Sequence, residues 1–310
     1  MNPPDSGELP AHVREQVDSD VTEILADAGC SGWLHATTIG SPQISHSYDA
    51  DAPVVLASVY KLAVLISLCR SADRRDIDLA ASITVDPTQW AQGPTGLAAL
   101  RDPVTLSRRD LATSMMTVSD NVAADVLLDE IGLDRVRDDL LDLGLRNTRI
   151  VGGVAELHER LQRETGTSTV QRLSPLSQIR TTTRRSALTM PPTRVRRHPR
   201  DCTTLLTSVW TDRAASNEMC AFIRDTMRRQ VFTSRLASGF PFRRVTVAGK
   251  TGTLVAIRNE IGVIEFPGEL PVAVAVFTMS ARSDPALPHV DRAIGEAART
   301  VVTELRVPEE

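Results

Sequence analysis

The stretch "LASVYKLAVLISL", residues 56–68, contains one of only two lysines in a chain of 310 residues. The second, Lys250, lies in "VAGKTGTL" (247–254), and the rest of the 35 basic residues are arginines. Arginine stays protonated in proteins, whereas a desolvated lysine beside another positive charge can lose its proton. Two lysines among so many arginines therefore suggest proton transfer or a compact point charge, although chance in an arginine-biased chain explains the count equally well.

Ser58 precedes Lys61 by three residues, at the beginning of a segment with helical spacing. Residues at i and i+3 share one face of a helix, and the free N–H groups and dipole of a helix N-terminus favour negative charge. A neutral Lys61 could take the proton of the Ser58 hydroxyl. This is the geometry of an activated nucleophile, with lysine in the role that histidine has in other serine hydrolases.

The bulk composition, with 42% hydrophobic residues and a formal net charge of −4, describes an ordinary globular chain with one large core or two smaller ones. Such a charge provides no general attraction to nucleic acid or anionic lipid, so we expect neither as a partner. The first 20 residues have no basic or apolar region typical of a signal peptide, and no apolar run reaches the roughly 18 residues of a membrane span. We expect a cytoplasmic protein without a membrane segment.

Metal and cofactor motifs are missing from the sequence. The four cysteines form no CxxC pair, and the six histidines have no spacing typical of metal ligands. No glycine-rich nucleotide-binding loop is present. We therefore expect buried thiols, no metal and no cofactor.

Both ends of the chain have β-strand patterns combined with one helix each. Residues 11–28 have helical spacing and 31–39 are typical of a strand, while a helix is predicted over 289–305. Runs rich in β-branched residues and broken by proline and glycine predict three successive antiparallel strands. These runs are "RRVTVAGKTGTL" (243–254), "NEIGVIEF" (259–266) and "PVAVAVFTMS" (271–280).

The middle of the chain is helical. Four segments have apolar residues at helical spacing: 60–74, 106–118, 121–132 and 133–144. Ser107 and Asp110 at the second segment resemble a capping box with aspartate in place of glutamate.

This order predicts an α+β fold in which an antiparallel sheet is flanked by helices and an all-α subdomain is inserted. Residues 1–56 and 203–310 would form the α/β subdomain, and 57–202 the all-α subdomain with a loop region over 147–200. Residues 180–200 contain seven arginines, which could bind an anionic ligand or carrier protein. A solvated loop is the simpler interpretation, because the interleaved aromatics of a nucleic-acid platform are absent.

Three motifs then occur in a fixed order: Ser58-Val59-Tyr60-Lys61, Ser119-Asp120-Asn121 and Lys250-Thr251-Gly252. A single S-x-x-K motif is weak, but the three together resemble the signatures of class A β-lactamases and the related penicillin-binding proteins. The resemblance covers about residues 15 to 305 and implies the α/β plus all-α architecture of that family. It also implies a small-molecule acyl substrate.

The resemblance implies a catalytic role for four residues. Ser58 would attack a carbonyl, with Lys61 as candidate base. Ser119 would relay a proton to the leaving nitrogen or oxygen, and Lys250 would keep the surroundings of Ser119 positive.

Thr253 is implied as a fifth catalytic residue, and four more residues are implied in substrate binding. Asn121 would hydrogen-bond a substrate amide, and Gly252 would allow the backbone to approach the substrate closely. The N–H of Thr253 would complete an oxyanion hole with the N–H of the nucleophile. Thr251 and Arg258 would meet a substrate carboxylate.

The sequence departs from the family where hydrolysis is completed. Class A enzymes carry a glutamate, with an asparagine four residues on, that hold the deacylating water. In "NTRIVGGVAELHERL" (147–161) the aligned residues are Val154 and His158. Valine cannot activate water. Either Glu156, His158 or Glu159 takes the role, or Lys61 does, or deacylation is slow, unless the segment is a plain surface helix.

Three hypotheses follow. The first is a serine hydrolase that opens a β-lactam or related amide through an acyl-Ser58 intermediate. The second is an intracellular esterase or acyltransferase on the same scaffold, which acts on an ester, amide or thioester and releases lactams slowly. The third is a penicillin-recognising sensor that is acylated once.

Overall fold

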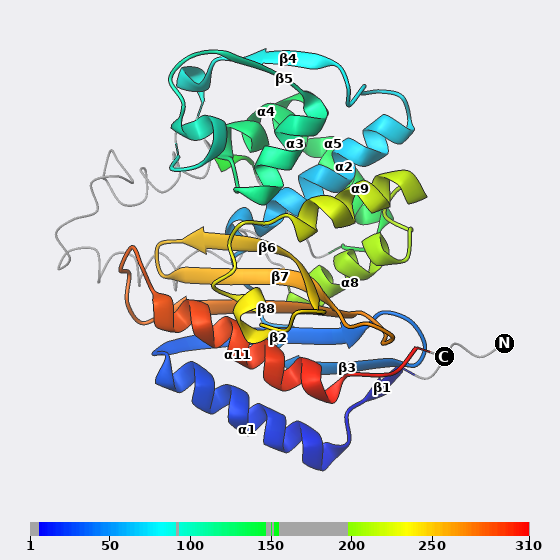
Figure 1. The fold of residues 1–310 in the computed structure, drawn as a ribbon, viewed down its shortest axis with the longest axis vertical. Coiled ribbons are helices and arrows are strands. Elements are labelled where there is room, and N and C mark those ends of the chain that lie inside the picture. The colour runs from blue at the N-terminus through cyan, green and yellow to red at the C-terminus, as the bar shows by residue number, and fades with distance from the viewer. Residues whose placement is uncertain (1–5, 91–92, 147–149, 151, 155–197, 310) are drawn as a thin grey trace.

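The structure is a computed structural model that describes residues 6–90, 93–146, 150, 152–154 and 198–309. Its central element is a six-stranded sheet with the strand order β1-β3-β2-β8-β7-β6 (Figure 1). The sheet is antiparallel, as predicted, except that β1 pairs with β3 in parallel. The strands are β1 (Ser6–Glu8), β2 (Cys30–Thr38), β3 (Gln43–Tyr48), β6 (Thr246–Leu254), β7 (Ile257–Glu265) and β8 (Val272–Ser280).

Strand β8 is buried on both faces, which explains its nearly continuous apolar sequence. Successive side chains point to opposite faces, so Val274 and Val276 join the hydrophobic cluster with α1 and α11, whereas Ala275 and Phe277 join the cluster with α8. Strands from the two ends of the chain are neighbours, since β2 pairs with β8 along its whole length. The covering helices are α1 (Ala11–Asp27) and α11 (Pro288–Glu304) on one face and α8 (Pro199–Trp210) on the other (Figure 1).

The helical layer is built around α2, which contacts α3, α4, α5 and α9. A helix that is apolar on all sides is expected to be buried, and α2 is buried from Lys61 through Cys69. It continues directly from a short 3₁₀ helix, η1. The elements are η1 (Ala57–Tyr60), α2 (Lys61–Asp73), α3 (Arg108–Thr117), α4 (Asn121–Ile131), α5 (Leu133–Asp142) and α9 (Asn217–Arg228).

The capping interaction at the start of α3 is present: Ser107 Oγ accepts a hydrogen bond from the backbone N–H of Asp110 at 3.1 Å. Several short elements were not predicted, since each is only three to four residues long. They are β1, the hairpin of β4 (Ser82–Val85) and β5 (Val104–Ser107), η2 (Pro87–Gln89), η3 (Gly96–Ala99) and α10 (Leu236–Gly239).

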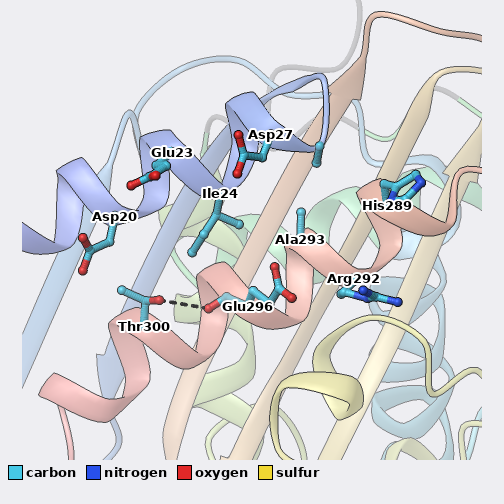
Figure 2. Close-up of a pocket in the computed structure, with 10 residues that line it drawn as sticks. Asp20, Glu23, Ile24, Asp27, His289, Arg292, Ala293, Glu296 and Thr300 are labelled. Carbon is cyan, nitrogen blue, oxygen red and sulfur yellow. Dashed lines mark hydrogen bonds between the residues drawn. The ribbon is translucent and has the colours of Figure 1, made fainter.

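No helix among the described residues has the length and apolar character needed to cross a membrane. A groove of about 500 Å³ runs between α1 and α11, as Figure 2 shows, and includes the carboxylates of Asp20, Glu23, Asp27 and Glu296. None of the predicted site residues that the structure describes lines it.

Candidate active site

Ser58 lies in η1, the 3₁₀ helix that leads directly into the buried helix α2. The preceding residue, Ala57, has a φ of 48°, a left-handed conformation that is uncommon for a residue other than glycine. Ser58 is partly exposed, whereas Val59 and Tyr60 are buried. The local backbone therefore turns Ser58 out of the core at the N-terminal end of the η1–α2 segment.

Lys61 is fully buried, and its ammonium group points to the turn between α3 and α4. Its Nζ donates to the carbonyl oxygens of Ser119 (2.7 Å) and Asp120 (3.2 Å), to Ser119 Oγ (3.4 Å) and to Asn121 Oδ1 (2.9 Å). Burial lowers the pKa of Lys61 to about 7, although the carboxylates of Asp120 and Asp125 act to raise it. A substantial fraction of Lys61 is therefore neutral near pH 7 and able to accept a proton.

Ser119 occupies the tight turn that joins α3 to α4, with a φ of 58°. The next residue, Asp120, is the N-cap of α4 and is fully buried. Its carboxylate accepts hydrogen bonds from four backbone N–H groups and one hydroxyl, those of Leu97, Ala98, Val122, Ala123 and Ser114. Asp120 thereby fixes the strained turn that presents Ser119.

Lys250 approaches Ser119 from the sheet. It is fully buried on β6, and its Nζ donates to Ser119 Oγ at 2.9 Å and to the carbonyl oxygen of Thr251 at 2.8 Å. Its pKa is lowered well below the ordinary value, mainly by burial and next by the positive charge of Lys61. Two lysines from different layers thus converge on one hydroxyl oxygen. Because like charges this close disfavour double protonation, the pair can hold one proton and give up another.

Strand β6 lies directly against η1, and Gly252 makes that contact possible. A Cβ at position 252 would come 2.5 Å from the carbonyl oxygen of Leu56 and 3.3 Å from Ala57 Cβ. Gly252 was predicted to allow the backbone to approach the substrate closely. In the structure, the side of Gly252 on which a Cβ would lie faces η1. The contact places β6, on which Thr253 is exposed, against η1, the short helix that carries Ser58.

The two residues predicted to meet a carboxylate, Thr251 and Arg258, are directed elsewhere. Thr251 is buried and donates from both its N–H and its Oγ1 to Gln230 Oε1, at 2.7 and 3.1 Å. Arg258 is buried too, and donates to four backbone carbonyl oxygens, those of Val255, Ile257, Asp284 and Pro285.

The arginine next to Thr253 is Arg235, which the sequence reasoning missed. Its Nη2 donates to Thr253 Oγ1 at 2.8 Å, and its Nη1 donates to the carbonyl oxygens of Gly252 and Asn259. Its Nε donates to Asp291 Oδ1 at 2.6 Å, in an ion pair. No motif surrounds Arg235 in the sequence. Its position emerges only when the segment before α10 packs against β6.

Val154 is buried and belongs to the main hydrophobic cluster. Its backbone N–H donates to Asp125 Oδ1 of α4 at 2.7 Å. Gly153 allows this approach, because a Cβ there would lie 2.3 Å from the same oxygen. The charge of Asp125 also acts to raise the pKa of Lys61, so the carboxylate that anchors Val154 is one that influences the lysine. Glu156, His158 and Glu159, as well as residues 180–197, lie outside the described residues.

A family model described as the beta-lactamase enzyme family matches residues 16–305. The beta-lactamase regulatory protein BlaB of Streptomyces cacaoi is 28% identical in an alignment of 274 positions that covers 83% of this chain and 88% of that protein. A β-lactamase from Sphaerobacter thermophilus is 24% identical with a TM-score of 0.72, over 92% of this chain and 96% of that chain. PBP-A is 19% identical with a TM-score of 0.74, over 98% of this chain and 100% of that chain.

Proposed function

Because the chain belongs to the beta-lactamase enzyme family, we propose that it is a serine hydrolase whose Ser58 is acylated by a β-lactam or a related amide. The observation that carries the proposal is the convergence of Lys61 and Lys250 on Ser119 Oγ, at 3.4 and 2.9 Å. In this proposal Lys61, three residues after Ser58, is the proton acceptor for the nucleophile, and Ser119 is the proton donor for the leaving group.

Acylation proceeds in two steps. Ser58 Oγ attacks the lactam carbonyl and its proton passes to neutral Lys61, while the N–H groups of Ser58 and Thr253 stabilise the developing oxyanion. The carbon–nitrogen bond then breaks, and Ser119 transfers its own proton to the leaving nitrogen. The proton held by Lys61 replaces the one lost from Ser119, to which Lys61 already donates. Lys250 keeps the Ser119 oxygen in a positive environment throughout.

In this proposal two groups of residues orient the substrate, one at its carboxylate and one at its acyl-side amide. Arg235 and Thr253 receive a substrate carboxylate, since Thr253 is exposed and Arg235 supplies the nearby positive charge. Asn121 offers its amide group to an acyl-side amide, with its Oδ1 held by Lys61.

Deacylation is slow in this proposal, because Val154 provides no group that can activate water. An acyl-enzyme that persists suits two alternative functions: an esterase or acyltransferase that passes the acyl group to an acceptor other than water, or a regulatory protein that records the presence of a lactam. The name of the BlaB relative refers to regulation. A point mutant of PBP-A has been solved as an acyl-enzyme complex with penicillin G.

The test is intact-protein mass spectrometry through a time course with a penicillin, a cephalosporin and a simple activated ester, with Ser58→Ala as control. We expect a Ser58-dependent lactam adduct that clears slowly. Rapid clearance with product would support an efficient β-lactamase instead. Turnover of the ester beside a persistent lactam adduct would favour the esterase or acyltransferase. A lack of adduct with any of the three compounds would refute the proposal.

A further inference from the structure

A buried carboxyl group lies on β7, the strand that pairs with the strand carrying Lys250. Glu260 on β7 pairs in register with Thr251 on β6 and is only 1% exposed. Its Oε1 accepts a hydrogen bond from Gln230 Nε2 at 2.5 Å, and its Oε2 accepts one from the backbone N–H of Leu236 at 2.7 Å. The proposed acylation chemistry makes no use of this group.

Gln230 connects Glu260 to the edge of β6. Its Oε1 accepts from the backbone N–H and the hydroxyl of Thr251. A backbone N–H can only donate, so the amide oxygen of Gln230 must face Thr251 and the amide nitrogen must face Glu260. Both oxygens of Glu260 then face obligatory donors, those of Gln230 and Leu236. The hydrogen-bond pattern therefore fits the ionised carboxylate and leaves no acceptor for a carboxyl proton.

The space for this chain of hydrogen bonds is provided by Gly249. A Cβ at that position would come 2.5 Å from Glu260 Oε1 and 3.0 Å from Gln230 Nε2. Any larger residue at this point of β6 would displace the carboxylate or the amide.

Charged groups on neighbouring elements surround Glu260 and Lys250. Burial raises the pKa of Glu260 to about 7, while the N–H of Leu236 and the charges of Arg235 and Lys250 act to lower it. Glu260 in turn raises the pKa of Lys250. Asp291 of α11 pairs with Arg235, and Arg258 lies two residues before Glu260 on β7. Loss of the Glu260 charge would leave Lys250 among positive groups.

We propose that Glu260 is a positioning residue: its ionised carboxylate, acting through Gln230, fixes β6 at Thr251 and sustains the charge of Lys250. A proton on Glu260 Oε1 would meet the N–H of the Gln230 amide, so the amide turns to accept it, Thr251 N–H loses its acceptor and acid weakens the acylation site. The effect on rate rests on the proposed acylation of Ser58. The hydrogen-bond switch does not, and the two are measured separately.

The switch is tested by NMR on the full chain labelled with ¹⁵N-threonine and ¹⁵N-leucine, titrated from pH 5 to 9, with the Thr251 and Leu236 signals assigned by substitution. We expect both amides to shift with one common midpoint near 7, and both titrations to disappear in Glu260→Gln. In Gln230→Met the Leu236 amide should still titrate while Thr251 should not. This second variant keeps the test decisive if Glu260→Gln does not fold. A Thr251 amide that does not titrate in the wild-type protein would overturn the proposal.

The effect on chemistry is tested by the rate of Ser58 acylation across the same pH range. In Glu260→Gln the amide N–H₂ would face donors that the carboxylate now satisfies, next to a charged group. The acylation rate of the wild-type protein should therefore exceed that of this variant by about ten-fold at high pH. The ratio should approach one below pH 6, where wild-type Glu260 is itself protonated. Glu265→Gln, the same change at a surface ion pair on β7, should match wild type throughout. A ratio that stays constant with pH would show a merely structural role. If wild type forms no adduct at all, the proposed function fails, and the NMR titration still decides the switch.

Discussion

Around Ser119 Oγ the protein places the amino groups of two lysines, whereas around Val154 it places hydrocarbon. Ser119 is half-buried and Val154 is buried, and both are anchored by an aspartate of the α4 region, Asp120 in one case and Asp125 in the other. The difference lies in what the anchored segment presents. The Ser119 turn presents a hydroxyl flanked by titratable groups, and the Val154 segment presents a methyl-bearing side chain. This difference supports the proposal that Ser58 is acylated and that Val154 gives no help in hydrolysing the acyl-enzyme.

Lys61→Arg should cause the largest loss, and it should do so in the rate of acylation. The positive charge is kept, but the guanidinium cannot give up its proton at neutral pH, so we expect acylation by a penicillin to slow by about 10³-fold. The rate of adduct formation measures this, with circular dichroism to check that the fold is retained. Near-native acylation would remove Lys61 from the role of base.

Val154→Glu adds to the second region the carboxylate that it lacks. A carboxylate at this position could activate water, and we expect the acyl-enzyme to decay about 10²-fold faster. Val154→Gln is the matched control, because it has nearly the same shape but takes no proton. Equal decay in both variants would mean that packing at position 154, rather than a missing base, controls the lifetime of the adduct.

Asp120→Asn tests how firmly the Ser119 turn is held. An amide nitrogen would face donors that the carboxylate now satisfies, so we expect a loss of about 2 kcal/mol in the free energy of unfolding, roughly a thirty-fold change in the equilibrium. Urea denaturation measures it, and Asp129→Asn on the exposed face of α4 is the control. Similar stability of the two variants would contradict the anchoring role of Asp120.

Lys250→Arg should have the smallest effect. A positive charge beside Ser119 is the main requirement at this position, so we expect acylation to slow by only about ten-fold. A loss as large as that of Lys61→Arg, measured in the same assay, would show that Lys250 also has to exchange a proton.

Several long elements and the order of the motifs were predictable from the sequence, whereas the helices α8 and α9 and the strand β3 were not predicted. The apolar run after Lys61 became the buried helix α2, and the strands carrying Lys250 and Glu260 formed as expected, because hydrophobic period and turn residues act locally. The surroundings of Thr251 and the position of Arg235 could not be predicted. They depend on how the segment between α9 and β6 folds back onto an edge strand, which no local pattern encodes.

The most direct measurement is the pair of rate constants for acylation and deacylation of Ser58 with one penicillin, obtained by quenched-flow mass spectrometry of the wild-type protein. The account predicts acylation that is fast relative to deacylation, so that nearly all the protein accumulates as the adduct. Deacylation as fast as acylation, with no accumulated adduct and steady product release, would contradict it.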